Sequence, residues 1–171
     1  ETQVTETIIK AAPSMILGGR LTSLSSWLES ITEKERNASP EILSIRGTIS
    51  MLKGENSTSL DFLNKAVEGF RNSSDQNELA RALTRRSTLF RIIGSYQQAI
   101  TDAQEAISIC SHLAGAIRLE AEAQRAHGVA CFQAGELKKA LASLSIALER
   151  YTLIAEEMDA AKVMLDLGLV Y

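Results

Sequence analysis

Proline is scarce in this chain: only Pro13 and Pro40 occur among its 171 residues, and the 131 residues that follow Pro40 contain none. Proline interrupts helices and marks loops and sheet edges, so such a long stretch without it favours a succession of helices. Aromatic residues make up only 5% of the chain, whereas β-strands are enriched in them. The composition therefore argues against a β-sandwich or β-barrel and predicts an all-α protein.

Cysteine, excess positive charge and long apolar runs are also lacking. The two cysteines, Cys110 and Cys131, are too few for a disulfide scaffold and are typical of a reducing, cytoplasmic compartment. The 18 basic residues against 21 acidic ones give a net charge of −3, so this segment is not expected to contact nucleic acid. No apolar run approaches the roughly 20 residues of a membrane-spanning helix, and no membrane partner is expected.

Four glycines, Gly19, Gly54, Gly94 and Gly135, mark an internal repeat with spacings of 35, 40 and 41 residues. Side chains of one kind stand at fixed distances from each glycine: small ones seven residues before it, and small or aliphatic ones nine and twelve residues after it. Such a period indicates units of two helices, with the glycine at the turn between them. The small residues, which would let the two helices approach closely, are Ala12, Gly47, Ser87 and Gly128.

The periodicity predicts nine helices, at about 2–18, 21–32, 40–53, 57–73, 76–93, 95–113, 115–134, 136–157 and 159–171. They group into units at about 2–38, 39–75, 76–114 and 115–157, with a partial unit at 158–171 that includes Tyr171. Because this last segment repeats only a first helix, the chain is expected to be a fragment of a longer protein. An uncovered apolar face of the last helix is expected to support self-association; it comprises Met164, Leu165, Leu167 and Val170.

Local signals add detail to this outline. The pair Ser39-Pro40 is the arrangement of an N-cap followed by a first-turn proline. Ser95 is expected to cap the helix that follows it, and the polar segment 72–77 indicates a linker between units. Pro13 is expected to kink the first helix or to mark its start. Trp27 is expected to pack in a buried seam rather than to stack on a ligand.

The segments Gly94-Ser-Tyr-Gln-Gln-Ala99 and Gly135-Glu-Leu-Lys-Lys-Ala140 resemble the tetratricopeptide repeat (TPR). The longer units here are similar to the variety found in bacterial regulators, peptide-sensing receptors and kinesin light chains. The resemblance implies a right-handed α–α superhelix of about four helix hairpins plus one unpaired C-terminal helix. The positions that depart from the repeat pattern are Arg86 and His127, where leucine is usual, and Ser59, where alanine is usual.

A narrower resemblance rests on Met15-Ile-Leu-Gly-Gly-Arg-Leu21, the pair Trp27-Leu28, and Pro40-Glu-Ile-Leu-Ser-Ile-Arg-Gly47. In this order they are similar to the helical sensor region of MalT-like, LuxR-type, ATP-dependent transcription regulators. That resemblance implies a regulatory module that binds an inducer or an inhibitory protein, flanked by a nucleotide-binding domain and a helix-turn-helix domain. The alternative is a scaffold or receptor module, unrelated to transcription, that binds a peptide or a helix in its concave groove.

The first helices of such units line a concave face, which is where solenoid proteins bind their ligands. A protein, a peptide or a small-molecule inducer is the expected partner. The repeat register assigns the following residues to this face: Glu41, Ser44, Thr48 and Met51 in the second unit; Arg81, Thr84, Arg85, Thr88 and Arg91 in the third; Glu122, Arg125, Val129, Phe132 and Gln133 in the fourth.

Three of these residues, Arg81, Arg85 and Arg91, are expected on one face of the third unit's first helix. Guanidinium groups bind carboxylates and phosphates bidentately, so the face would suit an anionic ligand. The alternative is a solvated face neutralised by nearby glutamates. A clamp for a peptide C-terminal carboxylate, as in co-chaperone repeats, is weakly supported, because only Arg81 and Arg85 match it and no asparagine accompanies them.

No pattern predicts catalysis, a metal site or a cofactor. His127 and Cys131 stand four residues apart, with Cys110 and His112 near in sequence, but the spacing matches no standard zinc site. Cys131 occupies a core position of the repeat, so buried thiols are expected. Neither histidine stands in a nucleophile motif and no glycine-rich phosphate loop occurs. The chain is expected not to be an enzyme.

Overall fold

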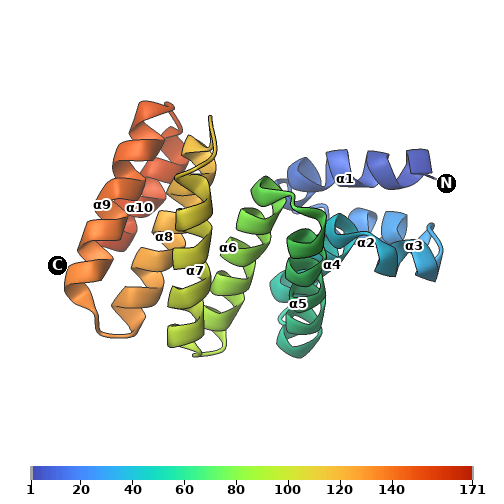
Figure 1. Cartoon of the computed structure of the whole chain (residues 1–171), viewed down its shortest axis with the longest axis horizontal. Coiled ribbons are helices and arrows are strands. Elements are labelled where there is room, and N and C mark those ends of the chain that lie inside the picture. The colour runs from blue at the N-terminus through green and yellow to red at the C-terminus, as the bar shows by residue number, and fades with distance from the viewer. Residues whose placement is uncertain (1, 171) are drawn as a thin grey trace. The chain divides into compact units, whose positions relative to one another are not determined.

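The computed structural model describes residues 2–170, and every element of regular secondary structure in that range is an α-helix (Figure 1). The all-α class predicted from the sequence is therefore confirmed for these residues. The chain divides into two compact units, one ending at Ser74 and the other beginning at Asp75. Tyr171, which was expected to extend the last helix, lies outside the described residues.

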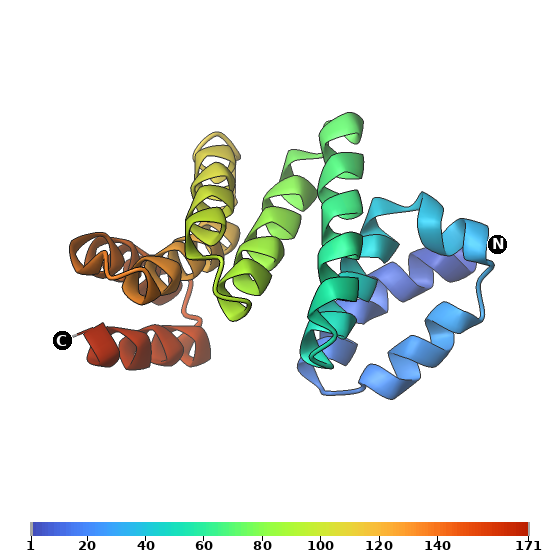
Figure 2. The ribbon, with the colours of Figure 1, turned by 90° about the horizontal axis from the view of Figure 1, so that it is seen from below.

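The unit that ends at Ser74 builds its core from aliphatic side chains. Its helix α1 packs against α2 and α4, while α4 and α5 form a close hairpin. The shared core includes Ile8, Leu24 and Ile42, each almost completely removed from water. Figure 2 lets the reader follow the chain from α1 through α2 and α3 into α4. The helices are α1 (Thr2–Leu17), α2 (Leu21–Glu29), α3 (Glu33–Ala38), α4 (Pro40–Leu52) and α5 (Asn56–Ser73).

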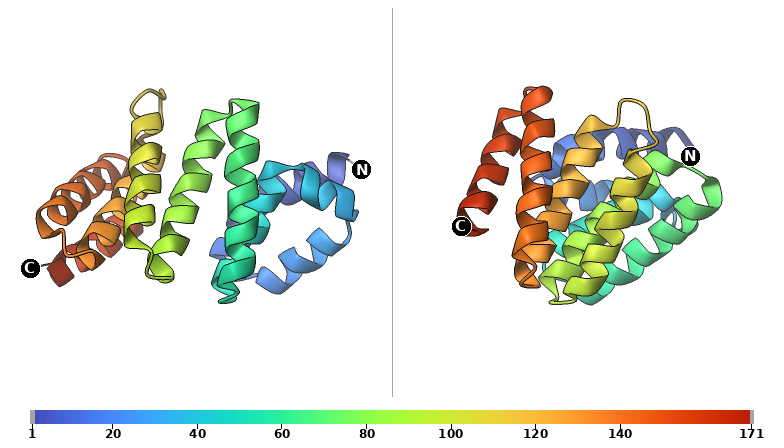
Figure 3. Two further views of the ribbon diagram at one scale, coloured as in Figure 1. Left: turned by 60° about the horizontal axis from the view of Figure 1, so that its bottom comes forward. Right: turned by 60° about the vertical axis from the view of Figure 1, so that its left-hand side comes forward.

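The unit that begins at Asp75 contains two hairpins and a final helix. Helix α6 pairs with α7, α8 pairs with α9, and α7 packs against α8, so these four lie side by side (Figures 1 and 3). Helix α10 lies against α9, where Val163 joins a core that contains Leu144 and Tyr151. The helices are α6 (Gln76–Ile92), α7 (Tyr96–Cys110), α8 (Ile117–Gln133), α9 (Leu137–Leu153) and α10 (Glu157–Val170).

Each of the three long hairpins turns at a glycine in the left-handed region. Gly54, Gly94 and Gly135 have φ values of 79°, 80° and 80°. The residue after each glycine donates its N–H to a carbonyl near the end of the first helix, as Glu136 does to Cys131 O at 2.8 Å. This bond is characteristic of the Schellman motif, which satisfies carbonyls that a helix end leaves unpaired. The glycines that anchor the repeat are turn residues, as predicted.

The turn between α9 and α10 has the same geometry without a glycine. Ala155 has a φ of 56°, and Glu156 N donates to Tyr151 O at 3.0 Å. Helix α9 therefore ends at Leu153 instead of continuing to residue 157 as predicted. The prediction was wrong because an alanine gives no signal for a left-handed turn.

The small position before each turn lets the two helices of a hairpin touch. A Cβ atom added at Gly47 would lie 2.7 Å from Leu63 Cγ, and one added at Gly128 would lie 2.7 Å from Leu144 Cγ. Both distances are too short for real atoms, so an alanine at either position would force the helices apart. Ser59, which departs from the usual alanine, donates its hydroxyl to Gly47 O at 2.7 Å and so leaves no polar atom unpaired.

A second contact crosses the same three hairpins in a constant register. The residue just before each small position touches the residue sixteen positions later, on the second helix. The chemistry differs, since the three contacts are a cation–π contact, an ion pair and a hydrogen bond. The departures from leucine are thus each matched by a partner. The pairs are Arg46 with Phe62, Arg86 with Asp102, and His127 with Ser143.

One short helix was missed because its side-chain cap was not recognised in the sequence. The segment between α2 and α4 contains the short helix α3, which begins with a capping box: Glu35 N donates to Thr32 Oγ1 at 3.3 Å and Thr32 N to Glu35 Oε2 at 2.8 Å. The linker expected at 72–77 is shorter, two residues long, although the helix ends predicted on either side of it, at 73 and 76, are confirmed. Ser74 ends α5 in the left-handed region and Asp75 Oδ1 accepts a hydrogen bond from Glu78 N at 3.1 Å.

Expectations for four single positions had mixed outcomes. Ser39 caps α4 as predicted, accepting from Ile42 N at 3.3 Å. Ser95 precedes α7, but its side chain makes no capping hydrogen bond. Pro13 lies inside α1 and does not mark its start. Trp27 is 42% exposed, because the buried stripe of α2 runs through neighbouring leucines and leaves the indole at its edge.

The left-handed alanine gives a stability prediction. Replacing Ala155→Gly should raise the free energy of unfolding by about 0.5–1 kcal/mol, because glycine adopts a positive φ without strain. Ala134→Gly is the matched control, since Ala134 has a φ of −80° and glycine there should destabilise through chain entropy. Urea unfolding followed by circular dichroism measures both. Equal losses of stability in the two variants would contradict the assigned turn.

The ion pair of the α6–α7 hairpin gives a second prediction. Arg86 and Asp102 have side chains only 14% and 8% exposed, so Arg86→Leu should destabilise the protein by about 3–5 kcal/mol by leaving a buried carboxylate unpaired. The double variant Arg86→Leu/Asp102→Leu should recover most of that loss, because no buried charge remains. Double-mutant urea denaturation measures the coupling, and additive losses would show that the pair does not act as a unit.

Candidate functional site

A concave pocket of about 460 Å³ lies within the unit that begins at Asp75. Helices α6, α8 and α10 provide most of its wall, and two side chains of α9, Leu144 and Tyr151, reach it from behind. Side chains from three different helices converge here because each is the first helix of a repeat unit. The residues assigned to the concave face that line this pocket are Thr84, Thr88, Arg91, Glu122, Arg125, Val129, Phe132 and Gln133.

The remaining lining residues were not assigned to the site from the sequence. Ala126 lies on α8, and Asp166, Leu169 and Val170 lie on α10. The α10 residues were missed because the first-helix register was not extended to the last segment. Tyr151 was missed because it belongs to a second helix; the residue is 3% exposed, and burial raises the pKa of its hydroxyl.

Two ion-pair systems fix the charged residues of the pocket. Arg125 on α8 donates through Nε to Asp166 Oδ2 on α10 at 2.6 Å. Glu122 accepts from Arg118 Nε at 3.2 Å, and the same guanidinium donates to Glu156 at 2.6 Å. These contacts tie α8 to α10 and to the turn before it, so the pocket has a fixed wall.

Arg91 contributes the third guanidinium of this region. Burial lowers the pKa of Arg91, repulsion by Arg125 lowers it further, and the Asp166 carboxylate opposes both effects. Arg91 is therefore partly withdrawn from water and lies within electrostatic reach of the Arg125–Asp166 pair. Among the described residues, its guanidinium has no hydrogen bond or ion pair.

The expected stripe of arginines on α6 divides into separate environments. Arg81 is exposed and pairs with Glu78 Oε1 at 3.1 Å, three residues earlier on the same helix. Arg85 is half-buried, and desolvation lowers its pKa. Neither lines the pocket, whereas Arg91 does. The structure thus brings together one of the three arginines with the groove residues of α8.

The residues assigned to the second unit lie in the other compact unit. Ser44 is 1% exposed and Thr48 is 8% exposed, and the Thr48 hydroxyl donates to Ser44 O at 2.9 Å. Glu41 is half-buried and accepts from Ser39 Oγ at 2.6 Å, and Met51 is also half-buried. The two hydroxyls are therefore not presented to solvent, contrary to the expectation for ligand-binding side chains.

The structure also contains two pockets in the unit that ends at Ser74, neither of which was expected from the sequence. One, of about 450 Å³, lies between α1 and α2 and is lined mainly by Val4, Ile8 and Trp27. The other, of about 270 Å³, includes Arg46 and Phe62. Trp27 is the only residue lining the first pocket that the sequence analysis singled out, and it was expected to be buried in a seam.

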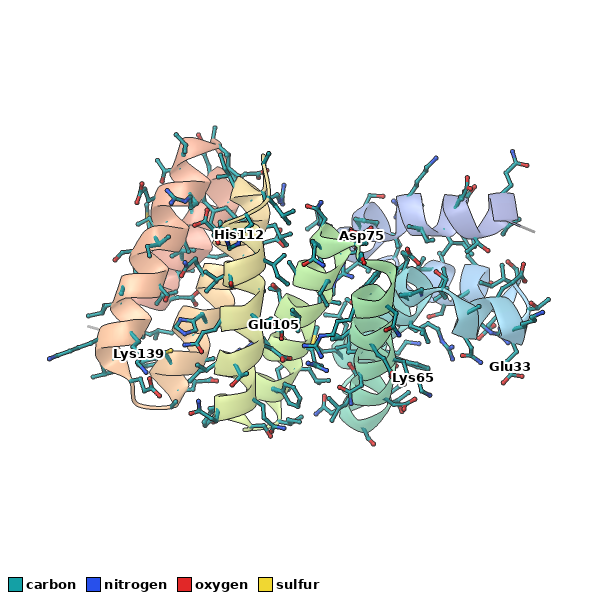
Figure 4. All side chains as sticks on the ribbon, viewed as in Figure 1. Glu33, Lys65, Asp75, Glu105, His112 and Lys139 are labelled. Carbon is teal, nitrogen blue, oxygen red and sulfur yellow. The ribbon has the colours of Figure 1, made fainter. Side chains whose placement is uncertain are left out.

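The cysteines and histidines do not form a ligand set. Cys110 and Cys131 are buried and free, as predicted, and burial raises the pKa of Cys110 to about 11. His112, labelled in Figure 4, is exposed in the turn after α7, whereas His127 is buried against Ser143. In the part of the chain that the structure describes, no group of three or more possible metal ligands occurs.

The last helix is only partly covered. Met164 and Leu165 are 58% and 73% exposed, whereas Leu167 and Val170 pack against the core of the second unit. The face expected to be uncovered is therefore divided between solvent and core.

Among the described helices, none combines the length and the apolar character that crossing a bilayer requires.

Comparisons with known proteins reveal relatives in structure but not in sequence. No protein-family model and no curated protein matches the chain. The structure of BtubC (BKLC) from P. vanneervenii is similar at 16% identity and a TM-score of 0.76, over 98% of this chain and 71% of that one. The MamA protein is similar at 22% identity and a TM-score of 0.62, over 88% and 75%. PilF of Pseudomonas aeruginosa is similar at 11% identity and a TM-score of 0.68, over 99% and 78%.

These likenesses establish the fold class. All three structures are TPR-like helical solenoids, so the predicted all-α, TPR-like arrangement of helix hairpins followed by a last helix is confirmed. At identities of 11–22% a structural likeness does not carry function. The assignment of a ligand therefore depends on the pocket itself.

The buried histidine gives a pH prediction. Desolvation lowers the pKa of His127, and Lys139 on α9 (Figure 4) lowers it further, against an opposing effect of Glu136. Since the unfolded chain then binds the proton more readily, stability should be fullest above about pH 6.5 and fall as the pH drops below it. His127→Gln should reduce this acid-side loss in urea unfolding at several pH values. His112→Gln, at the exposed histidine, is the control, and identical pH profiles for both variants would contradict the prediction.

Proposed function

We propose that this chain is a protein-interaction module that binds a peptide or a helix of a partner in the pocket formed by α6, α8 and α10. The observation that carries the proposal is the convergence of eight groove residues, from two successive first helices, on one cavity of about 460 Å³. Cavities of this size are typical of ligand sites, and solenoid repeats use this face for recognition.

The composition of the wall suits a polypeptide. Val129 and Phe132 offer apolar contacts, while Thr84, Thr88 and Gln133 offer side-chain donors and acceptors. A peptide has both apolar side chains and unpaired backbone amides, so such a wall satisfies both. The TPR-like fold of the three similar structures supports the same reading, because a stack of helix pairs is a scaffold for extended partners.

A pocket-filling variant tests the proposal. Peptides selected on the wild-type chain from a library of short random sequences should lose at least about tenfold in affinity for Ala126→Trp, because the indole would fill the cavity. Ala142→Trp is the matched control: Ala142 is exposed on α9, does not line the pocket, and should bind as the wild type does. Fluorescence anisotropy measures both affinities. Full binding by Ala126→Trp would place the selected peptides elsewhere and refute the proposal.

A role as the sensor region of a MalT-like transcription regulator remains a prediction from the sequence. Its support is the order of the three segments from Met15 to Leu21, at Trp27-Leu28 and from Pro40 to Gly47. A small-molecule inducer and self-association through α10 belong to that hypothesis. The flanking sequence of the parent gene decides it, since a phosphate-binding loop upstream and a helix-turn-helix domain downstream are both required.

A further inference from the structure

The charges of the pocket are unevenly matched. Four charged side chains line it: Arg91, Glu122, Arg125 and Asp166. Glu122 is engaged by Arg118, which does not line the pocket and also binds Glu156 and Asp159. Asp166 is engaged by Arg125 at 2.6 Å. Within residues 2–170, this leaves the Arg91 guanidinium as the lining charge that has no ion-pair partner.

The surroundings of Arg91 favour an anion. The side chain is half-buried. The free-energy cost of removing a guanidinium from water is offset when the group binds a carboxylate bidentately. Asp166 cannot serve both arginines equally, because its Oδ2 already lies on Arg125 Nε. A second carboxylate between Arg91 and Arg125 would relieve their mutual repulsion and give two cations two anions.

The apolar residues of the pocket wall indicate which side chain could bind next to such a carboxylate. Leu169 on α10 is 70% exposed although it lines the pocket, and Phe132 and Val129 on α8 are partly exposed. These side chains form the apolar part of a wall that also contains Arg91 and Arg125. A ligand that buries them gains about 25 cal/mol for each Å² of apolar area removed from water.

We propose that the pocket binds an acidic side chain of a partner peptide, held by Arg91, together with a neighbouring bulky apolar side chain held by Val129, Phe132 and Leu169. This deepens the proposed function and rests on it. The Arg125–Asp166 pair acts as the fixed counterpart that keeps Arg91 available.

Blocked tetrapeptides test the pairing directly. The probes are Ac-Leu-Glu-Phe-Leu-NH₂ and its analogue with glutamine in place of glutamate, titrated while the methyl signals of Val129 and Leu169 are followed by NMR. The wild type should bind the glutamate peptide about tenfold more tightly, as expected for one charge-assisted bidentate contact. Arg91→Met should remove this preference, and Arg91→Lys should retain part of it.

Arg81→Met is the matched control, because Arg81 lies on the same helix but is exposed and outside the pocket. It should keep the full preference, and circular dichroism verifies that each variant is folded. Equal affinity of the wild type for both peptides, an unchanged preference in Arg91→Met, or no binding at about 10 mM peptide would each overturn the inference. If library peptides still lose affinity in Ala126→Trp but show no acidic preference, only this inference fails and the proposed function stands.

Discussion

The close approach of two helices at one small residue is the constraint on which each hairpin depends. At Gly47 and Gly128 the backbone of the first helix lies so near a leucine of the second that even a methyl group would collide with it. At Ser87 the equivalent side chain uses its hydroxyl to bond Ala99 O at 2.8 Å. Because the helices are this close, the residues beside the small position are forced into contact, and their chemistry must match.

That match explains why polar residues are tolerated where leucine is usual. A buried arginine is stable in α6 because Asp102 meets it with two hydrogen bonds of 2.7 and 2.9 Å. A buried histidine is stable in α8 because Ser143 lies 2.7 Å from its ring nitrogen. The same hairpins hold α6 and α8 in the register that places their outward residues on the pocket. Packing inside the hairpins thus positions the groove residues.

Much of the fold and part of the groove followed from the sequence. Glycine at a left-handed turn is a strong local signal, so the long hairpins were placed within a few residues. Ala155 adopts the same backbone conformation without that signal, and the end of α9 before it was misplaced. Helix α3 depends on a reciprocal pair of hydrogen bonds between Thr32 and Glu35, which hydrophobic periodicity does not detect.

In the groove, too, the sequence predicted what depends on one helix and missed what depends on contacts between helices. A helical register identifies which side chains share a face, and this was sufficient for α8, whereas on α6 it also assigned Arg81 and Arg85, which do not line the pocket. It does not identify which charges neutralise one another across helices, since that depends on tertiary distances. Asp166 is forty-one residues from Arg125 in sequence and 2.6 Å from it in space. The environment of Arg91 follows from that contact and could not be derived without it.

The constant register of the cross-helix pairs has a consequence for how repeats keep their own partners. Similar hairpins in one chain risk exchanging second helices during folding, because their apolar surfaces are alike. Here an exchange would place Arg86 against Ser143 and His127 against Asp102, and would leave charges without their full set of bonds. The cross-helix pair of each hairpin therefore favours its own second helix over that of another hairpin. The residues that depart from the repeat pattern are the ones that provide this specificity.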